Sequence, residues 1–180
     1  MMANAVLIID MVRGFLEPGH NLYCSDESRA VIPHVRELAE RELSRGSRLL
    51  FLCDNHAPDD LEFRIFPPHC IRGTHETEVI QELRDLPGDI IPKTRYSAFH
   101  NTTLDDHLMH IGPERLIITG VCTDICVLYT AEDARNRDFD VEVPIDCVTS
   151  FDPQGHGFAL DHMKRILGVQ VVGDDASRSS

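Results

Sequence analysis

Short apolar runs alternate with longer amphipathic stretches along the 180-residue chain, and this alternation restricts the possible fold more than any other feature. Strands separated by segments of helical length are typical of βαβ units and a parallel sheet. Each apolar run is almost continuously hydrophobic, which suits a strand covered on both faces. Six strands are predicted, over residues 5–9, 47–53, 89–91, 115–119, 141–145 and 169–172.

Four helices are predicted between these strands. Apolar residues at helical spacing from Val31 to Leu43 indicate the first helix, and Gly46 marks its end. The other three are expected over 103–110, 123–137 and 153–167, the last with Asp152 as N-cap and Pro153 in its first turn. The pattern predicts a doubly wound, three-layer αβα fold of the α/β class with a mostly parallel six-stranded sheet.

The chain has the length of one domain, so we expect a single domain over residues 1–173. Residues 174–180 contain one apolar side chain and are expected to be disordered. The sequence has 17 Lys and Arg against 30 Asp and Glu, a net charge of −13, which argues against nucleic acid or an anionic membrane as partner.

The first residues contain no basic segment, and their apolar run is too short for a signal peptide or a membrane span. We therefore expect a cytoplasmic protein. The six cysteines are then expected to be reduced thiols, available for catalysis or metal binding.

Polar side chains follow four of the predicted strands at the same edge of the sheet. Asp10 ends the first strand, Asp54 and His56 follow the second, Lys93 follows the third, and Cys126 comes just after the fourth. Ligands of open parallel sheets bind at the carboxyl ends of the strands, near the point where the strand order reverses. The irregular stretch 54–77 is long, and long irregular loops in compact domains are usually functional.

The segment from Gly120 to Cys126 is predicted to run from a strand end through a tight turn into a helix. A cysteine in the first turn of a helix feels the positive end of the helix dipole, which favours the thiolate, and free N–H groups there can receive an oxyanion. Lys93 could stabilise that thiolate and Asp10 could shuttle a proton. The residues alone also allow Cys126 as a buried apolar side chain, Lys93 as surface and Asp10 as a turn cap.

The stretch 54–69 contains a candidate metal site. Asp54, His56 and His69 offer three nitrogen and oxygen ligands with open coordination positions, which suits a catalytic or substrate-binding ion, and Glu62 could be a fourth ligand. A solvated polar loop is the alternative. The spacing of Cys122 and Cys126 matches neither a zinc knuckle nor a thioredoxin motif.

Four segments resemble the isochorismatase-like cysteine hydrolase superfamily, and within it the compact bacterial and archaeal nicotinamidases. They are AVLIIDMVRGF, KTRYSAF, ITGVCTDICVLYTAEDA and, for the metal loop, CDNHAPDDLEFRIFPPHC. The resemblance covers about residues 4–172. It implies Asp10, Lys93 and Cys126 as the catalytic triad.

The resemblance also implies a cis peptide bond between Val121 and Cys122, with the N–H groups of Cys122 and Cys126 forming an oxyanion hole. It implies a divalent metal ion, zinc before iron or manganese, on Asp54, His56 and His69, with Glu62 as an optional ligand. A pyridine ring would lie among Phe15, Phe66 and Tyr96.

The implied reaction converts nicotinamide to nicotinate and ammonia through a cysteine thioester, in a homo-oligomer. Val12 and Asn55 depart from residues common in the family and bear on substrate fit. Three alternatives stay open at this point: a metal-independent hydrolase of another small amide or carbamoyl compound, an isochorismate-type hydrolase, and a non-catalytic binding protein.

Overall fold

A computed structural model describes residues 3–173, so the predicted tail lies outside the described residues. Six strands form one parallel sheet in the order β3-β2-β1-β4-β5-β7, and a two-residue strand, β6, pairs with the end of β4. The prediction of a six-stranded parallel sheet is confirmed. The strands are β1 (Ala5–Ile9), β2 (Arg48–Asp54), β3 (Asp89–Lys93), β4 (Leu116–Val121), β5 (Val141–Pro144), β6 (Val148–Thr149) and β7 (Gln170–Val172).

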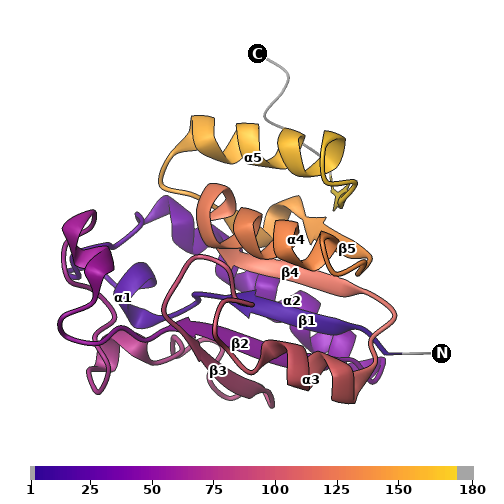
Figure 1. Cartoon of the computed structure of the whole chain (residues 1–180), viewed down its shortest axis with the longest axis horizontal. Helices are drawn as coiled ribbons and strands as arrows, with labels where there is room; N and C mark the ends of the chain where they lie inside the picture. Colours follow the sequence, from indigo (N-terminus) through magenta and orange to yellow (C-terminus); the bar gives the residue numbers. More distant parts are fainter. Residues whose placement is uncertain (1–2, 174–180) are drawn as a thin grey trace.

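Helices cover both faces of the sheet, as Figure 1 shows. Side chains of α3 (Leu104–Ile111), α4 (Leu128–Arg135) and α5 (Pro153–Arg165) share one buried cluster, and those of α2 (Val31–Ser44) belong to a second. Leu7 of β1 packs into the first cluster and its neighbour Ile8 into the second, as alternation along a strand requires. The predicted three-layer αβα architecture is therefore confirmed.

Several short elements were not predicted, because three or four residues are too few to show a periodicity. They are α1 (Arg13–Leu16) and the 3₁₀ turns η1 (Glu27–Ala30), η2 (Leu61–Arg64), η3 (His75–Thr77) and η5 (Ile145–Cys147). The predicted helix over 123–137 is divided: a π-helical turn, η4 (Thr123–Val127), precedes α4. Strand β3 extends past Pro92 to Lys93, which an edge strand tolerates because proline there need not donate to a neighbour.

The strand order reverses between β1 and β4, and these two strands approach each other closely at their carboxyl ends. Gly120 has a φ of +111°, and a Cβ built on it would lie 1.9 Å from the Ile9 carbonyl oxygen. Only glycine fits both the conformation and the contact. Polar residues that follow β1 and β4 are thereby brought together at the switch point.

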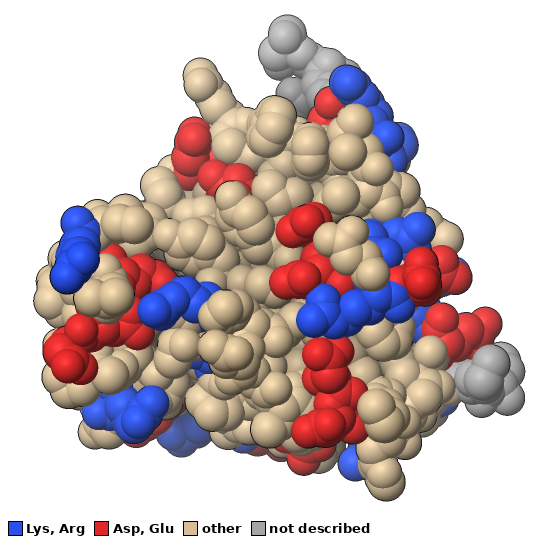
Figure 2. All heavy atoms as spheres, viewed as in Figure 1, with Lys and Arg blue, Asp and Glu red and all other residues tan. Residues whose placement is uncertain are grey.

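Between residues 3 and 173, no helix has both the length and the apolar character that a membrane span requires. On the face drawn in Figure 2, acidic and basic side chains are interspersed, and no extended basic patch is visible.

Candidate active site

Three neighbouring strand ends bring Asp10, Asp54 and Lys93 into contact. Asp54 and Lys93 are register partners on β2 and β3, and the Lys93 ammonium contacts an oxygen of Asp54. Lys93 Nζ lies 2.8 Å from Asp10 Oδ2, and the Asp54 N–H donates to Asp10 Oδ1 at 3.0 Å. All three side chains are buried, so their charges interact with little screening.

Cys126 lies in the π-helical turn η4, beside this group. Its sulfur is 3.5 Å from Lys93 Nζ, and its side chain is buried. The Val121–Cys122 peptide bond is cis. The Cys122 carbonyl accepts hydrogen bonds from the N–H groups of Ile125 and Val127, at 3.1 and 3.2 Å, which fixes the start of the turn.

The buried charges set the protonation states of the site. Burial, reinforced by Asp54, raises the pKa of Asp10 to about 6, although Lys93 opposes the shift. Burial disfavours the charged form of Lys93, but Asp10 and Asp54 together hold the pKa of its ammonium well above the usual value. The pKa of Asp54 is lowered despite burial, chiefly because Lys93 is adjacent. Lys93 is thus a permanent cation between two carboxyl groups.

The thiol of Cys126 differs from the sequence-based expectation of a stabilised thiolate. Burial raises the pKa of Cys126 well above its ordinary value, and Lys93 only partly offsets this effect. A cysteine of this kind needs a base beside it to become a nucleophile. Asp10 and Cys126 both lie against the Lys93 ammonium, and the Asp10 carboxyl can fill that role.

Asp54, His56 and His69 form a buried group whose ligand atoms all lie within 4.8 Å of one another. Within the described part of the chain, the buried imidazole Nε2 of His56 has no hydrogen-bond partner and lies 3.4 Å from Asp54 Oδ2, and His69 Nε2 is 3.7 Å from the same oxygen. These separations are too long for good hydrogen bonds but suit ligands about 2.0–2.2 Å from a shared zinc ion. The residues therefore fit a divalent metal.

The other ring nitrogens of the two histidines are already engaged. His56 Nδ1 is 3.1 Å from Asp60 Oδ2, and His69 Nδ1 is 2.9 Å from the Pro67 carbonyl oxygen. Such partners fix the tautomer that leaves Nε2 free for a metal. Arg95 in turn holds Asp60, at 3.0 and 3.2 Å from its two oxygens.

Glu62 lies at the edge of this group. Its Oε1 is 3.8 Å from His69 Nε2, and its side chain is buried. Burial and the nearby Asp54 raise its pKa. Phe63 was not predicted as part of the site, yet its ring packs 5.5 Å from both imidazoles and restricts their orientation.

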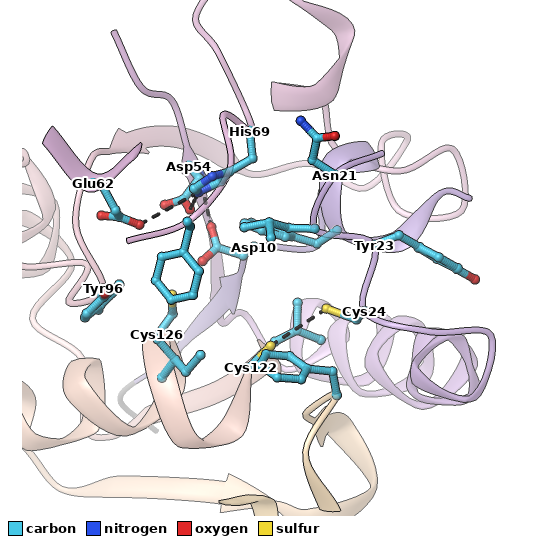
Figure 3. Close-up of a pocket in the computed structure, with 16 residues that line it drawn as sticks. Asp10, Asn21, Tyr23, Cys24, Asp54, Glu62, His69, Tyr96, Cys122 and Cys126 are labelled. Carbon is cyan, nitrogen blue, oxygen red and sulfur yellow. Dashed lines mark hydrogen bonds and ion pairs between the residues drawn. The ribbon is translucent and has the colours of Figure 1, made fainter. Parts of the chain in front are cut away.

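One cavity of about 260 Å³ is lined by residues of the Asp10–Lys93–Cys126 group and of the candidate metal site (Figure 3). This is slightly below the range of about 300–1000 Å³ for ligand pockets, so the cavity suits a small molecule. Cys126 and Asp10 line it together with Asp54, Glu62 and His69. Val121 and Cys122 and the three predicted aromatic residues, Phe15, Phe66 and Tyr96, also lie in its wall.

Sequence reasoning missed the remaining wall, which is formed by Asn21, Leu22, Tyr23, Cys24, Ile125 and Phe151. Residues 21–24 belong to an irregular segment and carry no motif, so the sequence held no signal for them. Asp60 and Arg95 lie inside segments that the sequence had singled out, and their spacing from His56 and Lys93 could have suggested supporting roles.

Comparison with known structures finds the same fold in hydrolases of small amides. A nicotinamidase/pyrazinamidase of Bacillus subtilis is 35% identical, with a TM-score of 0.89 over 96% of this chain and 100% of that chain. A pyrazinamidase of Pyrococcus horikoshii, solved in complex with zinc, is 32% identical, with a TM-score of 0.86 over 95% and 99%. An N-carbamoylsarcosine amidase of Thermoplasma acidophilum is 32% identical, with a TM-score of 0.86 over 97% and 98%.

The model of the isochorismatase domain family matches residues 4–174, nearly the whole chain. With the parallel sheet and the buried cysteine at its switch point, this match shows that the chain belongs to the isochorismatase family of hydrolases.

Proposed function

We propose that the protein is a metal-dependent nicotinamidase, which hydrolyses nicotinamide to nicotinate and ammonia. One observation carries the proposal: the Asp10–Lys93–Cys126 group and the Asp54–His56–His69 group open onto the same small cavity, whose wall is largely apolar and aromatic. A heteroaromatic amide needs both a nucleophile for its carbonyl and an apolar slot for its ring.

The charge of the cavity wall favours an uncharged substrate. Among the described residues, no Lys or Arg lines the cavity, whereas Asp10, Asp54 and Glu62 do. A substrate with a carboxylate, such as N-carbamoylsarcosine, would find no Lys or Arg side chain in this wall to pair with its charge. Nicotinamide carries no charge and avoids this cost.

The proposed reaction begins with proton transfer from the Cys126 thiol to Asp10 as the sulfur attacks the amide carbon. Lys93 stabilises the developing negative charge, and the N–H groups of Cys122 and Cys126 receive the oxyanion. Asp10 then passes the proton to the departing nitrogen, which leaves as ammonia and a thioester remains. Water attacks the thioester as it gives one proton to Asp10, and this proton then passes to the departing sulfur. The acid that is released loses its remaining proton to solvent and leaves as nicotinate.

Asp54, His56 and His69, with Glu62 as a further ligand, would hold the metal. When bound, the ion supplies a Lewis-acidic site for the pyridine nitrogen and so orients the ring. Zinc is the proposed metal, since imidazole and carboxylate ligands suit it, and the same ligands accept iron or manganese. A cytoplasmic homo-oligomer remains our prediction for the assembled protein.

Ammonia release from nicotinamide by the purified, zinc-loaded protein tests the proposal. We expect activity that is abolished in Cys126→Ala and lost after chelation, then restored by zinc. Cys126→Ala should still bind nicotinamide in a calorimetric titration, because the apolar wall and metal ligands remain. N-carbamoylsarcosine, assayed in parallel, distinguishes the carbamoyl alternative: faster ammonia release from it than from nicotinamide would refute the proposed substrate.

A further inference from the structure

Two thiols that the proposed reaction does not use meet in the wall of the cavity. Cys24 Sγ and Cys122 Sγ are 3.7 Å apart, although 98 positions separate the residues in the sequence. Figure 3 shows this pair on the opposite side of the cavity from Asp54 and His69. Only the backbone N–H of Cys122 has a part in the proposed mechanism, so neither sulfur has an assigned role.

We propose that Cys24 and Cys122 form an oxidation site, at which a hydroperoxide converts the two thiols into a disulfide that narrows the substrate cavity. Disulfides in reducing compartments are usually transient and redox-sensing, and a redox-sensing cysteine often lies next to a second cysteine that resolves its sulfenic acid.

The geometry leaves a short movement to complete the bond. The sulfurs of a disulfide are about 2 Å apart, so the observed gap closes by less than 2 Å. Cys122 is held by the hydrogen bonds to its carbonyl oxygen and by its place at the end of β4. Cys24 is half-buried in an irregular segment, where its N–H donates to the Phe15 carbonyl oxygen at 2.9 Å. Cys24 is therefore the partner that moves.

The same contrast decides which sulfur reacts first. Cys122 is buried, and its hydrogen bond with Cys24, together with burial, keeps its pKa well above that of an ordinary thiol. The more exposed Cys24 sulfur attacks the peroxide O–O bond and becomes a sulfenic acid, releasing water when the oxidant is hydrogen peroxide. The Cys122 sulfur then displaces the hydroxyl group, which leaves as water with the thiol proton. Two thiols and one peroxide thus become one disulfide and two waters.

Disulfide formation would alter the cavity directly. Leu22 and Tyr23 precede Cys24 in the same wall and would be drawn inward with it. Cys122 starts the turn that carries Cys126, so strain would also reach the nucleophile. We expect ligand binding to be lost on oxidation and recovered after reduction by dithiothreitol.

The test uses Cys126→Ala protein, which removes oxidation of the nucleophile as a competing reaction. After hydrogen peroxide treatment, the intact mass should fall by two hydrogen atoms, and peptide mapping without reduction should link Cys24 to Cys122. Dithiothreitol should reverse both changes. The matched control is Cys24→Ser combined with Cys126→Ala, which should show no loss of two hydrogens.

Nicotinamide binding to the oxidised and reduced Cys126→Ala protein is the second readout. The mass measurement needs no substrate, so its outcome is independent of the proposed activity. The proposal is wrong if Cys24 and Cys122 stay unlinked, either unchanged or carrying added oxygen, under conditions that oxidise a free model thiol. If the Cys24–Cys122 disulfide forms but the oxidised protein binds nicotinamide as tightly as the reduced protein does, the proposed narrowing of the cavity is wrong.

Discussion

At the scale of single residues, Lys93 has the most constrained environment in the site. Its ammonium is buried between Asp10 and Asp54 and contacts the sulfur of Cys126. A buried charge is stable only while its partners remain, and removal of one partner leaves the others uncompensated. Lys93, which we propose stabilises the Cys126 thiolate, therefore also compensates the buried charges of Asp10 and Asp54.

Lys93→Met tests this double role, since methionine keeps much of the side-chain volume without the charge. We expect the free energy of unfolding to fall by about 3–5 kcal/mol and amide hydrolysis to be lost, because two buried carboxyl groups lose their counter-ion. Urea denaturation of chelator-treated protein measures the change. Lys164→Met is the control: Lys164 is exposed on α5, and its replacement should alter stability by less than about 0.5 kcal/mol.

Asp60 contacts His56, one of the proposed metal ligands, without belonging to the proposed ligand set itself. In Asp60→Asn the carboxylate that engages His56 Nδ1 is lost, and we expect zinc affinity to fall by about 10- to 100-fold. Competition with a chromogenic chelator measures the affinity without any assay of activity. The neighbouring Asp59 is exposed, so Asp59→Asn should bind zinc as the unaltered protein does. Equal affinities for the two variants would contradict the role assigned to Asp60.

At the scale of elements, the π-helical turn η4 is positioned by the start of α5. Asp124 belongs to the turn, and its Oδ2 would lie 2.2 Å from a Cβ built on Gly155 of α5. Thr123 Oγ1 contacts His156 Nδ1 at 2.8 Å, beside the same position. The helix and the turn that carries Cys126 therefore pack together without room for a further methyl group.

Two glycines of α5 allow a matched test of this packing. Gly155→Ala should lower the free energy of unfolding by about 1–3 kcal/mol through overpacking, and should also reduce kcat by displacing the turn. Gly157→Ala should instead raise the free energy of unfolding by about 0.5–1 kcal/mol, because alanine favours the helix. Among the described residues, no atom outside its two chain neighbours and the helix's own backbone lies within 4 Å of a Cβ built on Gly157. Thermal denaturation of both variants measures the difference. An increase in the stability of Gly155→Ala would show that η4 can move to accommodate the added methyl group.

At the scale of the whole molecule, we expect the excess of acidic residues to disfavour anionic ligands of the cavity. The net charge is −13, and the charged residues that line the cavity are acidic. A field of one sign repels ligands of the same sign, and salt screens the repulsion over about 8–10 Å at ordinary ionic strength. An anionic amide should therefore be disfavoured during approach as well as in the cavity.

Nicotinamide and its 5-carboxy derivative form a suitable pair, because they share the ring and the reacting amide. We expect a lower kcat/KM for the anionic compound, and a rise in its kcat/KM relative to nicotinamide as ionic strength increases. Steady-state assays across a salt series measure the ratio. A ratio that does not change with salt would show that the molecular charge has no part in selection.

Much of the architecture could be predicted from sequence because its signals are local. The strand and helix periods and the Asp152 cap on Gln154 depend on residues a few positions apart, and the candidate metal ligands lie within one segment, 54–69. The carboxyl-end location of Asp10, Asp54 and Lys93 follows from strand assignment alone, since parallel strands end at a common edge. Their roles in catalysis come from resemblance and remain predictions to be tested.

The features that only the tertiary structure decided are contacts between distant segments. The pairing of Cys24 with Cys122, the support of Asp60 by Arg95 and the packing of Asp124 against Gly155 join residues 98, 35 and 31 positions apart. The depth at which Cys126 is buried, which raises its pKa, depends on the same packing. Local periodicity determines which face of an element is buried, but the identity of the neighbour that covers it is set only when the layers close together.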